Sequence, residues 1–115
     1  MAALADKQMG TVINAMHADP AHDWTLQDLG ERAGMSRSNF AQKFKMTVGT
    51  SAMDYLTRWR MLLAGDKLTG SGESIATIAL SLGYESESAF STAFKRVMGC
   101  SPTAIWARQY PGHGT

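Results

Sequence analysis

The chain contains almost no cysteine and little proline. Its single cysteine, Cys100, excludes an internal disulfide and a cysteine-rich zinc site. None of the three prolines lies in Ser51–Leu68, so no proline interrupts helical hydrogen bonding in that stretch. No apolar run reaches the ~18 residues of a membrane helix, and no signal-peptide pattern is present. We therefore expect a soluble, cytoplasmic protein with no membrane contact.

The sequence also lacks the residue arrangements of enzymes. The three histidines are His17, His22 and His113, and no cysteine or glutamate joins the first two at metal-ligand spacing. No Ser/His/Asp pattern of a hydrolase and no phosphate-binding glycine loop is present. We expect no catalytic residue, no metal and no cofactor.

Acidic residues are missing from two long blocks. Residues 32–53 carry four basic side chains and residues 88–115 carry three, with no acid in either block. The other residues hold four basic side chains and all ten acids. The net charge of +1 therefore consists of +7 in the two blocks and −6 elsewhere. This segregation favours an anionic partner for the two blocks; the alternative is a set of solvated helix faces.

One long helical stretch, Ser51–Leu68, stands at the centre of the chain. Ser51 is a good N-cap, and Leu56, Trp59 and Leu63 recur at helical spacing. At 1.5 Å per residue, its 18 residues span roughly 27 Å. The stretch is flanked by two copies of a shorter pattern.

The two copies are Leu26–Ser51 and Ile75–Ser101. Their first matches, up to Gly34 and Gly83, are offset by 49 residues, and one extra residue after Gly83 makes the later offset 50. The residues that recur at the later offset are Ser36, Ser38, Phe40, Phe44, Lys45, Gly49 and Ser51. Two copies are too few for a solenoid, so the repeat indicates one supersecondary unit used twice.

Each copy predicts two short helices joined by a tight turn. Thr25 caps the first helix, which stops at Gly34, and Ser36 caps the second, which stops before Gly49. The later copy repeats this order. A short glycine-containing turn followed by a basic helix is the helix-turn-helix signature. A further helix is expected at Leu4–Ala18, where apolar residues recur at helical spacing.

The second helix of the first copy has a core side and an outward side. Phe40 and Phe44 lie one turn apart and are expected to face the core. The outward stripe then consists of Ser38, Ala41, Gln42 and Lys45. Gln42 can pair with both N6 and N7 of adenine, and Ser38 can bond to a base edge. Basic side chains nearby can reach phosphates, which position a protein without reading sequence.

The second copy offers an equivalent stripe. Its members are Ser88, Ser91, Thr92 and Lys95, with Glu87 near the helix start. Glu87 can accept a hydrogen bond from cytosine N4. It can equally be a favourable charge at a helix N-terminus, and the sequence leaves both readings open.

These segments closely resemble the DNA-binding domain of the AraC/XylS family of bacterial transcription regulators. The resemblance lies in AGMSRSNFAQKF, YLTRWRM and SIATIALSLGYESESAFSTAFKR followed by GCSP, and it covers about Leu4–Arg108. It implies an all-α domain of about seven helices, with two helix-turn-helix units bridged by a long central helix. The two recognition helices would enter successive major-groove segments, ~34 Å apart, close to the reach of the long helix. The expected division is residues 1–50 for the N-terminal helix and first unit, 51–69 for the linker helix, and 70–115 for the second unit and C-terminal helix.

Carried over by position, the resemblance also implies which residues contact DNA. The base-reading residues would be Ser38, Ala41, Gln42, Glu87, Ser88 and Thr92. The phosphate contacts would be Ser36, Arg37, Lys43, Lys45, Ser86, Lys95 and Arg96. Gln42 and Thr92 stand where family members often have arginine, which leaves open how strongly the second unit reads sequence.

The resemblance further implies partners. These are double-stranded promoter or operator DNA and RNA polymerase, and the domain alone is expected to be a monomer. Family members usually carry a ligand-sensing domain before this one, and the WTL, GMSRS and YLTRWRM segments look most like members with a cupin-like sensor. We expect a C-terminal domain without its N-terminal sensor, the alternative being a complete single-domain regulator. For function, the alternative is a helical protein-interaction module without DNA binding.

Overall fold

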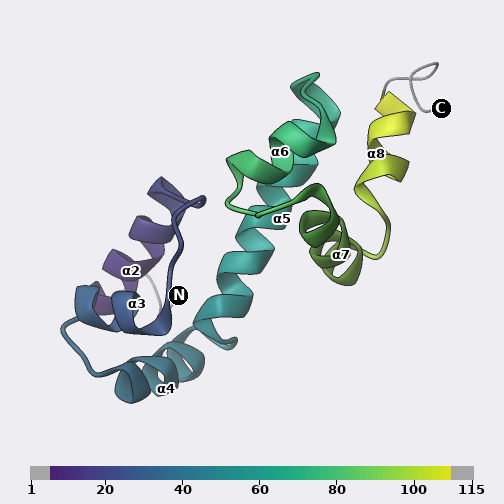
Figure 1. Ribbon diagram of the computed structural model, residues 1–115. Helices are drawn as coiled ribbons and strands as arrows, with labels where there is room; N and C mark the ends of the chain where they lie inside the picture. Colours follow the sequence, from purple (N-terminus) through teal and green to yellow (C-terminus); the bar gives the residue numbers. More distant parts are fainter. Residues whose placement is uncertain (1–5, 110–115) are drawn as a thin grey trace. The chain divides into compact units, whose positions relative to one another are not determined.

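The computed structural model describes residues 6–109 and shows seven helices and no strand in that range (Figure 1). The helices are α2 (Lys7–Ala18), α3 (Leu26–Arg32), α4 (Arg37–Val48), α5 (Ala52–Gly70), α6 (Ile75–Ser81), α7 (Glu87–Met98) and α8 (Pro102–Gln109). The predicted all-α fold with two short-helix pairs and a long central helix is confirmed. Across the described range, every helix is too short or too polar to span a bilayer.

The chain divides into two compact units, Met1–Leu56 and Thr57–Thr115. Helix α5 begins in the first unit and continues in the second, so each unit uses part of it as a wall. The three-part division at residues 50 and 69 stays a prediction.

The first unit is built from α2, α3, α4 and the start of α5. Helix α3 packs against both α2 and α4. The apolar stripes of these helices meet in one core, whose fully buried large side chains are Met9, Met16, Leu29, Phe40, Phe44 and Leu56. This core fixes which face of α4 is left for solvent.

The second unit follows the same plan with its extra helix at the other end. Helix α6 packs against α7, and both contact α8. Its fully buried large side chains are Met61, Leu68, Ile78, Leu82, Phe90 and Phe94. The unit therefore completes its core with a C-terminal helix, whereas the first unit uses the N-terminal helix α2.

The turn inside each unit is closed by the same backbone hydrogen bonds. Gly34 adopts a left-handed φ of +70°, and the Met35 amide donates to the Gly30 carbonyl at 2.9 Å. In the second unit Gly83 has φ +89°, and the Tyr84 amide makes the matching bond at 3.1 Å. This six-to-one closure around a left-handed glycine is a Schellman motif, which ends the first helix and aims the chain into the second.

The predicted helix caps are confirmed. The hydroxyl groups that accept a hydrogen bond from a backbone amide three residues later are those of Thr25, Ser36, Ser51, Ser74, Ser86 and Ser101. Helix α2 differs from expectation, because the Asp6 carboxylate caps it and its regular part begins at Lys7. The expected start, Leu4, lies outside the described residues.

Candidate nucleic-acid interface

Helices α4 and α7 have the same length and the same pattern of exposure. Each has 12 residues. At an offset of 50, every position from Ser36 to Thr47 matches its counterpart, Ser86 to Val97, in being buried, half-buried or exposed. The sequence repeat is therefore a structural repeat, and the two helices present equivalent faces.

Phenylalanine pairs anchor both helices in their cores. Phe40 and Phe44 are fully buried with ring centroids 5.7 Å apart, and Phe90 and Phe94 are buried with the same separation. The expectation that these rings face inward is confirmed. Because they hold one side of each helix, the opposite side must face solvent.

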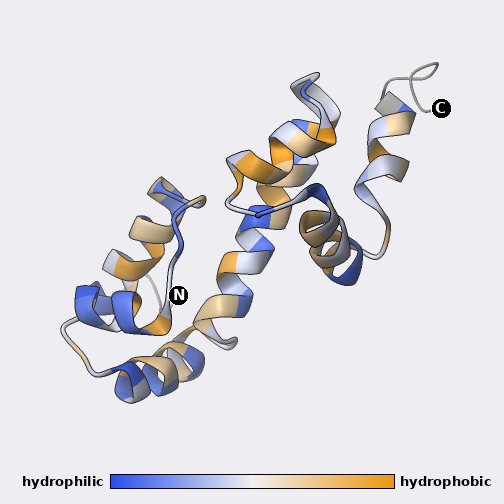
Figure 2. Cartoon of the chain, in the orientation of Figure 1, coloured by the Kyte–Doolittle hydropathy of each residue, from blue (hydrophilic) through white to orange (hydrophobic). Residues whose placement is uncertain are grey.

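The predicted base-reading residues lie on the solvent side. Ser38, Gln42, Glu87, Ser88 and Thr92 are exposed and Ala41 is half-buried. Figure 2 shows hydrophilic residues in blue on α4 and α7, beside the apolar positions that enter the cores. The structure thus brings each predicted set together on one face of its own helix.

Most of the predicted phosphate contacts are also exposed. Arg37, Lys45, Lys95 and Arg96 project from α4 and α7, and within residues 6–109 none of the four pairs with a carboxylate. The hydroxyl oxygens of two further members of the set, Ser36 and Ser86, accept amide hydrogen bonds as helix caps. Their hydroxyl hydrogens can still donate to an anion, since a hydroxyl group both accepts and donates.

Lys43, a predicted phosphate contact, also has partners within the first unit. Its ammonium lies 3.3 Å from the Asp6 carboxylate and donates to the Gln8 side-chain oxygen at 2.7 Å. The Gln8 amide group in turn donates to the Ala33 carbonyl at 2.9 Å. Lys43 is therefore engaged inside the first unit, where it ties α4 to α2, and its contact with a phosphate stays a prediction.

The same contact affects the electrostatics of Asp6. A hydrogen bond from the Met9 amide, assisted by the Lys43 ammonium, holds the pKa of the Asp6 carboxyl below its ordinary value. The ionised carboxylate is thus the form that the folded unit favours.

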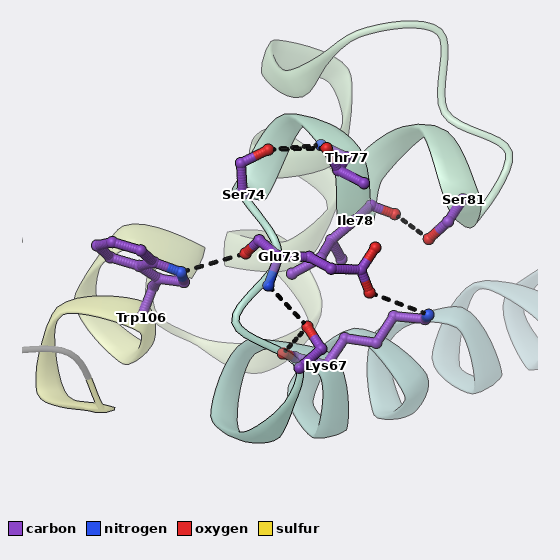
Figure 3. Close-up of polar contacts among 8 residues, drawn as sticks. Lys67, Glu73, Ser74, Thr77, Ile78, Ser81 and Trp106 are labelled. Atoms are coloured by element: carbon purple, nitrogen blue, oxygen red, sulfur yellow. Dashed lines mark hydrogen bonds and ion pairs between the residues drawn. The ribbon is translucent and has the colours of Figure 1, made fainter.

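In the second unit, polar contacts fix the chain just before α6. The Trp106 indole N–H donates to the Glu73 carbonyl at 3.3 Å, and the Glu73 carboxylate lies 3.7 Å from the Lys67 ammonium (Figure 3). Ser74 then caps α6, and its hydroxyl also lies 2.9 Å from that of Thr77. These contacts join α5, α6 and α8 and so brace the helix on which α7 packs.

Glu87 is the first residue of α7 and borders a hollow of about 300 Å³ with Ser74, Ile75, Ala76 and Trp106. Its carboxylate is exposed. At the first helical position a negative charge is favourable, and an exposed glutamate can also accept a hydrogen bond from cytosine N4. Both readings of Glu87 therefore remain.

Exposed residues outside the predicted stripe also belong to this face. Asn39 and Met46 of α4 are exposed beside Gln42, and these three residues line one open groove. Sequence reasoning missed them because it placed the stripe by its angle to the buried phenylalanines. The repeat could have indicated Met46, because its equivalent position in the second copy is Arg96, a predicted phosphate contact.

Each unit is a helix-turn-helix whose second helix is anchored in the core by a phenylalanine pair and exposes its other face. Two such units make a double helix-turn-helix domain. A family model described as "Helix-turn-helix domain" matches residues 29–108, most of the chain. The chain belongs to the AraC-type helix-turn-helix family, which consists of DNA-binding transcription regulators and not of enzymes.

Curated relatives are longer proteins. The chain is 49% identical over 102 residues to a Streptomyces lividans protein named as an AraC-like transcription regulator, a match covering 89% of this chain and 34% of that protein. It is 39% identical over 99 residues to the RCS-specific HTH-type transcriptional activator RclR of Escherichia coli K12, covering 86% and 35%. The chain thus spans about a third of the length of the curated relatives it matches.

Solved structures share the fold. The DNA-binding domain of AdpA, a global transcriptional factor in complex with a target DNA, has a TM-score of 0.83 and 25% identity, covering 93% of this chain and 99% of that chain. A DNA-binding transcriptional dual regulator of Escherichia coli K-12 has a TM-score of 0.79 and 31% identity, covering 90% and 93%.

Proposed function

We propose that this chain binds double-stranded DNA sequence-specifically and regulates transcription, with α4 and α7 as recognition helices in successive major-groove segments. The observation that carries the proposal is the position-by-position match of α4 and α7, two equivalent helices with anchored inner faces and polar outer faces. The major groove of B-DNA admits a helix of this size, and its base edges carry the full donor and acceptor code.

The proposed contacts divide into two kinds. Bases are read by Ser38, Ala41, Gln42, Glu87, Ser88 and Thr92. Phosphates are bound by Ser36, Arg37, Lys43, Lys45, Ser86, Lys95 and Arg96. Phosphate contacts set the register of each helix, and base contacts then discriminate between sequences.

The two units should read DNA unequally. Gln42 is the one side chain of the predicted stripes that can make a bidentate amide contact to adenine. Its counterpart Thr92 is short and can give one hydrogen bond or a methyl contact to thymine. The first unit should therefore discriminate more strongly at this position.

Salt dependence of binding tests the proposal against the protein-interaction alternative. If the exposed basic residues contact about five phosphates, log K should fall with log salt at a slope of about −4.5. Fluorescence anisotropy of a labelled duplex between about 50 and 200 mM salt measures this slope. A slope near zero for the folded chain would contradict DNA binding and support the alternative module.

At the level of the whole protein, we propose a cupin-like sensor domain preceding this domain, RNA polymerase as a partner, and a cytoplasmic location. The greater length of the relatives and the activator name of RclR support the first two.

The chain alone should be a monomer. Sedimentation equilibrium should then give 12.5 kDa at all concentrations, and a mass that rises with concentration would contradict it.

A further inference from the structure

Met46 is the most exposed large apolar side chain in the described part of the chain, with 78% of its surface accessible. It lies in the last third of α4, at the position where α7 has Arg96. A guanidinium group there suits a phosphate, whereas a thioether cannot bind one. The two units therefore need different contacts at this point.

The surroundings of Met46 connect it with the proposed base-reading face. It lines an open groove of about 380 Å³ whose other walls are Met35, Asn39, Gln42, Lys43 and Thr47. Gln42 stands one helical turn before Met46 and also belongs to the base-reading stripe. The groove is thus continuous with the surface proposed to enter the DNA major groove.

The charge of this groove is compensated. Its only cation, Lys43, is paired with the Asp6 carboxylate and bonded to the Gln8 oxygen. The remaining walls are amides, a hydroxyl and two thioethers. Such a surface suits a partner that offers an apolar group beside hydrogen-bonding edges. In the major groove, the C5-methyl group of thymine is that apolar group.

We propose that Met46 is a specificity-determining residue that contacts the C5-methyl group of a thymine next to the adenine read by Gln42. This inference rests on the proposed function and deepens it. The methionine side chain is unbranched and adaptable, so it can follow a methyl group along the groove. The first half-site is then read by an amide and a thioether, while Arg96 holds a phosphate at the same position of the second.

Deoxyuridine substitution tests the contact directly, because it removes the C5-methyl group and leaves base pairing intact. A binding site is first selected for the whole chain from random duplex DNA. Each thymine of the first half-site is then replaced singly by deoxyuridine. One replacement should raise Kd about fourfold, the equivalent of one buried methyl group. For Met46→Gln, which keeps side-chain length and helix propensity, that difference should disappear.

The control is Arg96→Ala, which should raise the Kd for the thymine duplex and for the deoxyuridine duplex by the same factor. Circular dichroism checks that both variants fold, as expected for exposed positions. If the wild type binds its selected duplex but no deoxyuridine replacement matters, the Met46 inference is overturned while the proposed function stands. If Met46→Gln shows the same rise in Kd on deoxyuridine substitution as the wild type, the Met46 inference is also overturned. If the chain binds no duplex at all, the proposed function itself fails.

Discussion

The ammonium of Lys43 in α4 lies 3.3 Å from the carboxylate of Asp6, the residue that caps α2. The same carboxylate accepts a hydrogen bond from the Met9 amide at 3.0 Å. One side chain therefore both caps α2 and holds α4 against it. Helix α2 thus helps to position α4.

Two substitutions at Asp6 should separate its cap from its ion pair. Asp6→Asn keeps a good N-cap but loses the charge, and Asp6→Ala loses both. At neutral pH, calorimetry should give melting temperatures in the order wild type, Asp6→Asn, Asp6→Ala. Equal values for the two variants would contradict a capping contribution.

The ion pair also predicts a pH dependence. The Met9 amide and then Lys43 lower the native pKa of Asp6, so its stabilisation is fully present above the unfolded pKa of about 3.9. It is lost as pH falls through the lowered native pKa, because the carboxyl group is then protonated in both states. The difference in melting temperature between wild type and Asp6→Asn should therefore shrink on acidification. A constant difference would contradict stabilisation by the ionised Asp6 carboxylate.

Phe40 and Phe90 should be equivalent core anchors. Both are fully buried, so Phe40→Ala and Phe90→Ala should each lower the free energy of unfolding by about 3 to 5 kcal/mol. Urea denaturation measures the change, and the matched Phe→Leu variants should cost less. A loss under about 1 kcal/mol at either site would show that its helix face is assigned wrongly.

Gly30 lies where α3 approaches the turn. A Cβ atom built there would lie 3.0 Å from the Met35 carbonyl oxygen and 3.5 Å from the Phe40 Cβ. Gly30→Val should therefore destabilise the first unit by about 1 to 3 kcal/mol through overpacking. The control Gly10→Ala, with no atom within 4 Å of the new Cβ, should stabilise α2 by up to about 1 kcal/mol in urea denaturation. An unchanged midpoint for Gly30→Val would contradict the close approach.

The proposed readers of DNA can be ranked by substitution. Gln42→Ala should reduce discrimination against a mismatched base in the first half-site by about 1 to 3 kcal/mol. Thr92→Ala should cost less and change specificity little. Lys45→Ala should weaken binding to all duplex sequences nearly equally and reduce the slope of log K against log salt by about one unit. Binding of matched and mismatched duplexes measures all three, and a larger specificity loss for Thr92→Ala would make the second unit the dominant reader.

Sequence patterns predict the local features of this fold well. Helix caps depend on a hydroxyl three residues from an amide, and helix ends on a glycine with positive φ, as at Ser36 and Gly34. The outward face of α4 follows from the spacing of Phe40 and Phe44 alone. These features could be predicted because each depends on residues within about one helical turn.

Features that depend on distant residues could not be predicted. The basic character of α4 predicts a phosphate contact for Lys43, but it does not show that the ammonium also contacts Gln8 of α2 and Asp6, the residue that caps that helix. Nothing in the spacing of α4 reveals that pairing. The groove beside Met46 is equally invisible from helical periodicity, because its walls depend on how the turn at Met35 packs against α4.

Hydroxyl-radical footprinting on the selected site tests most directly whether α4 and α7 enter successive major-groove segments of one duplex. If they do, the DNA should show two protected patches on one face, about 10 to 10.5 base pairs apart. Gln42→Ala should weaken the patch over the first half-site more than the patch over the second. A single protected patch, or two patches on opposite faces of the duplex, would contradict binding by both helices in successive major-groove segments.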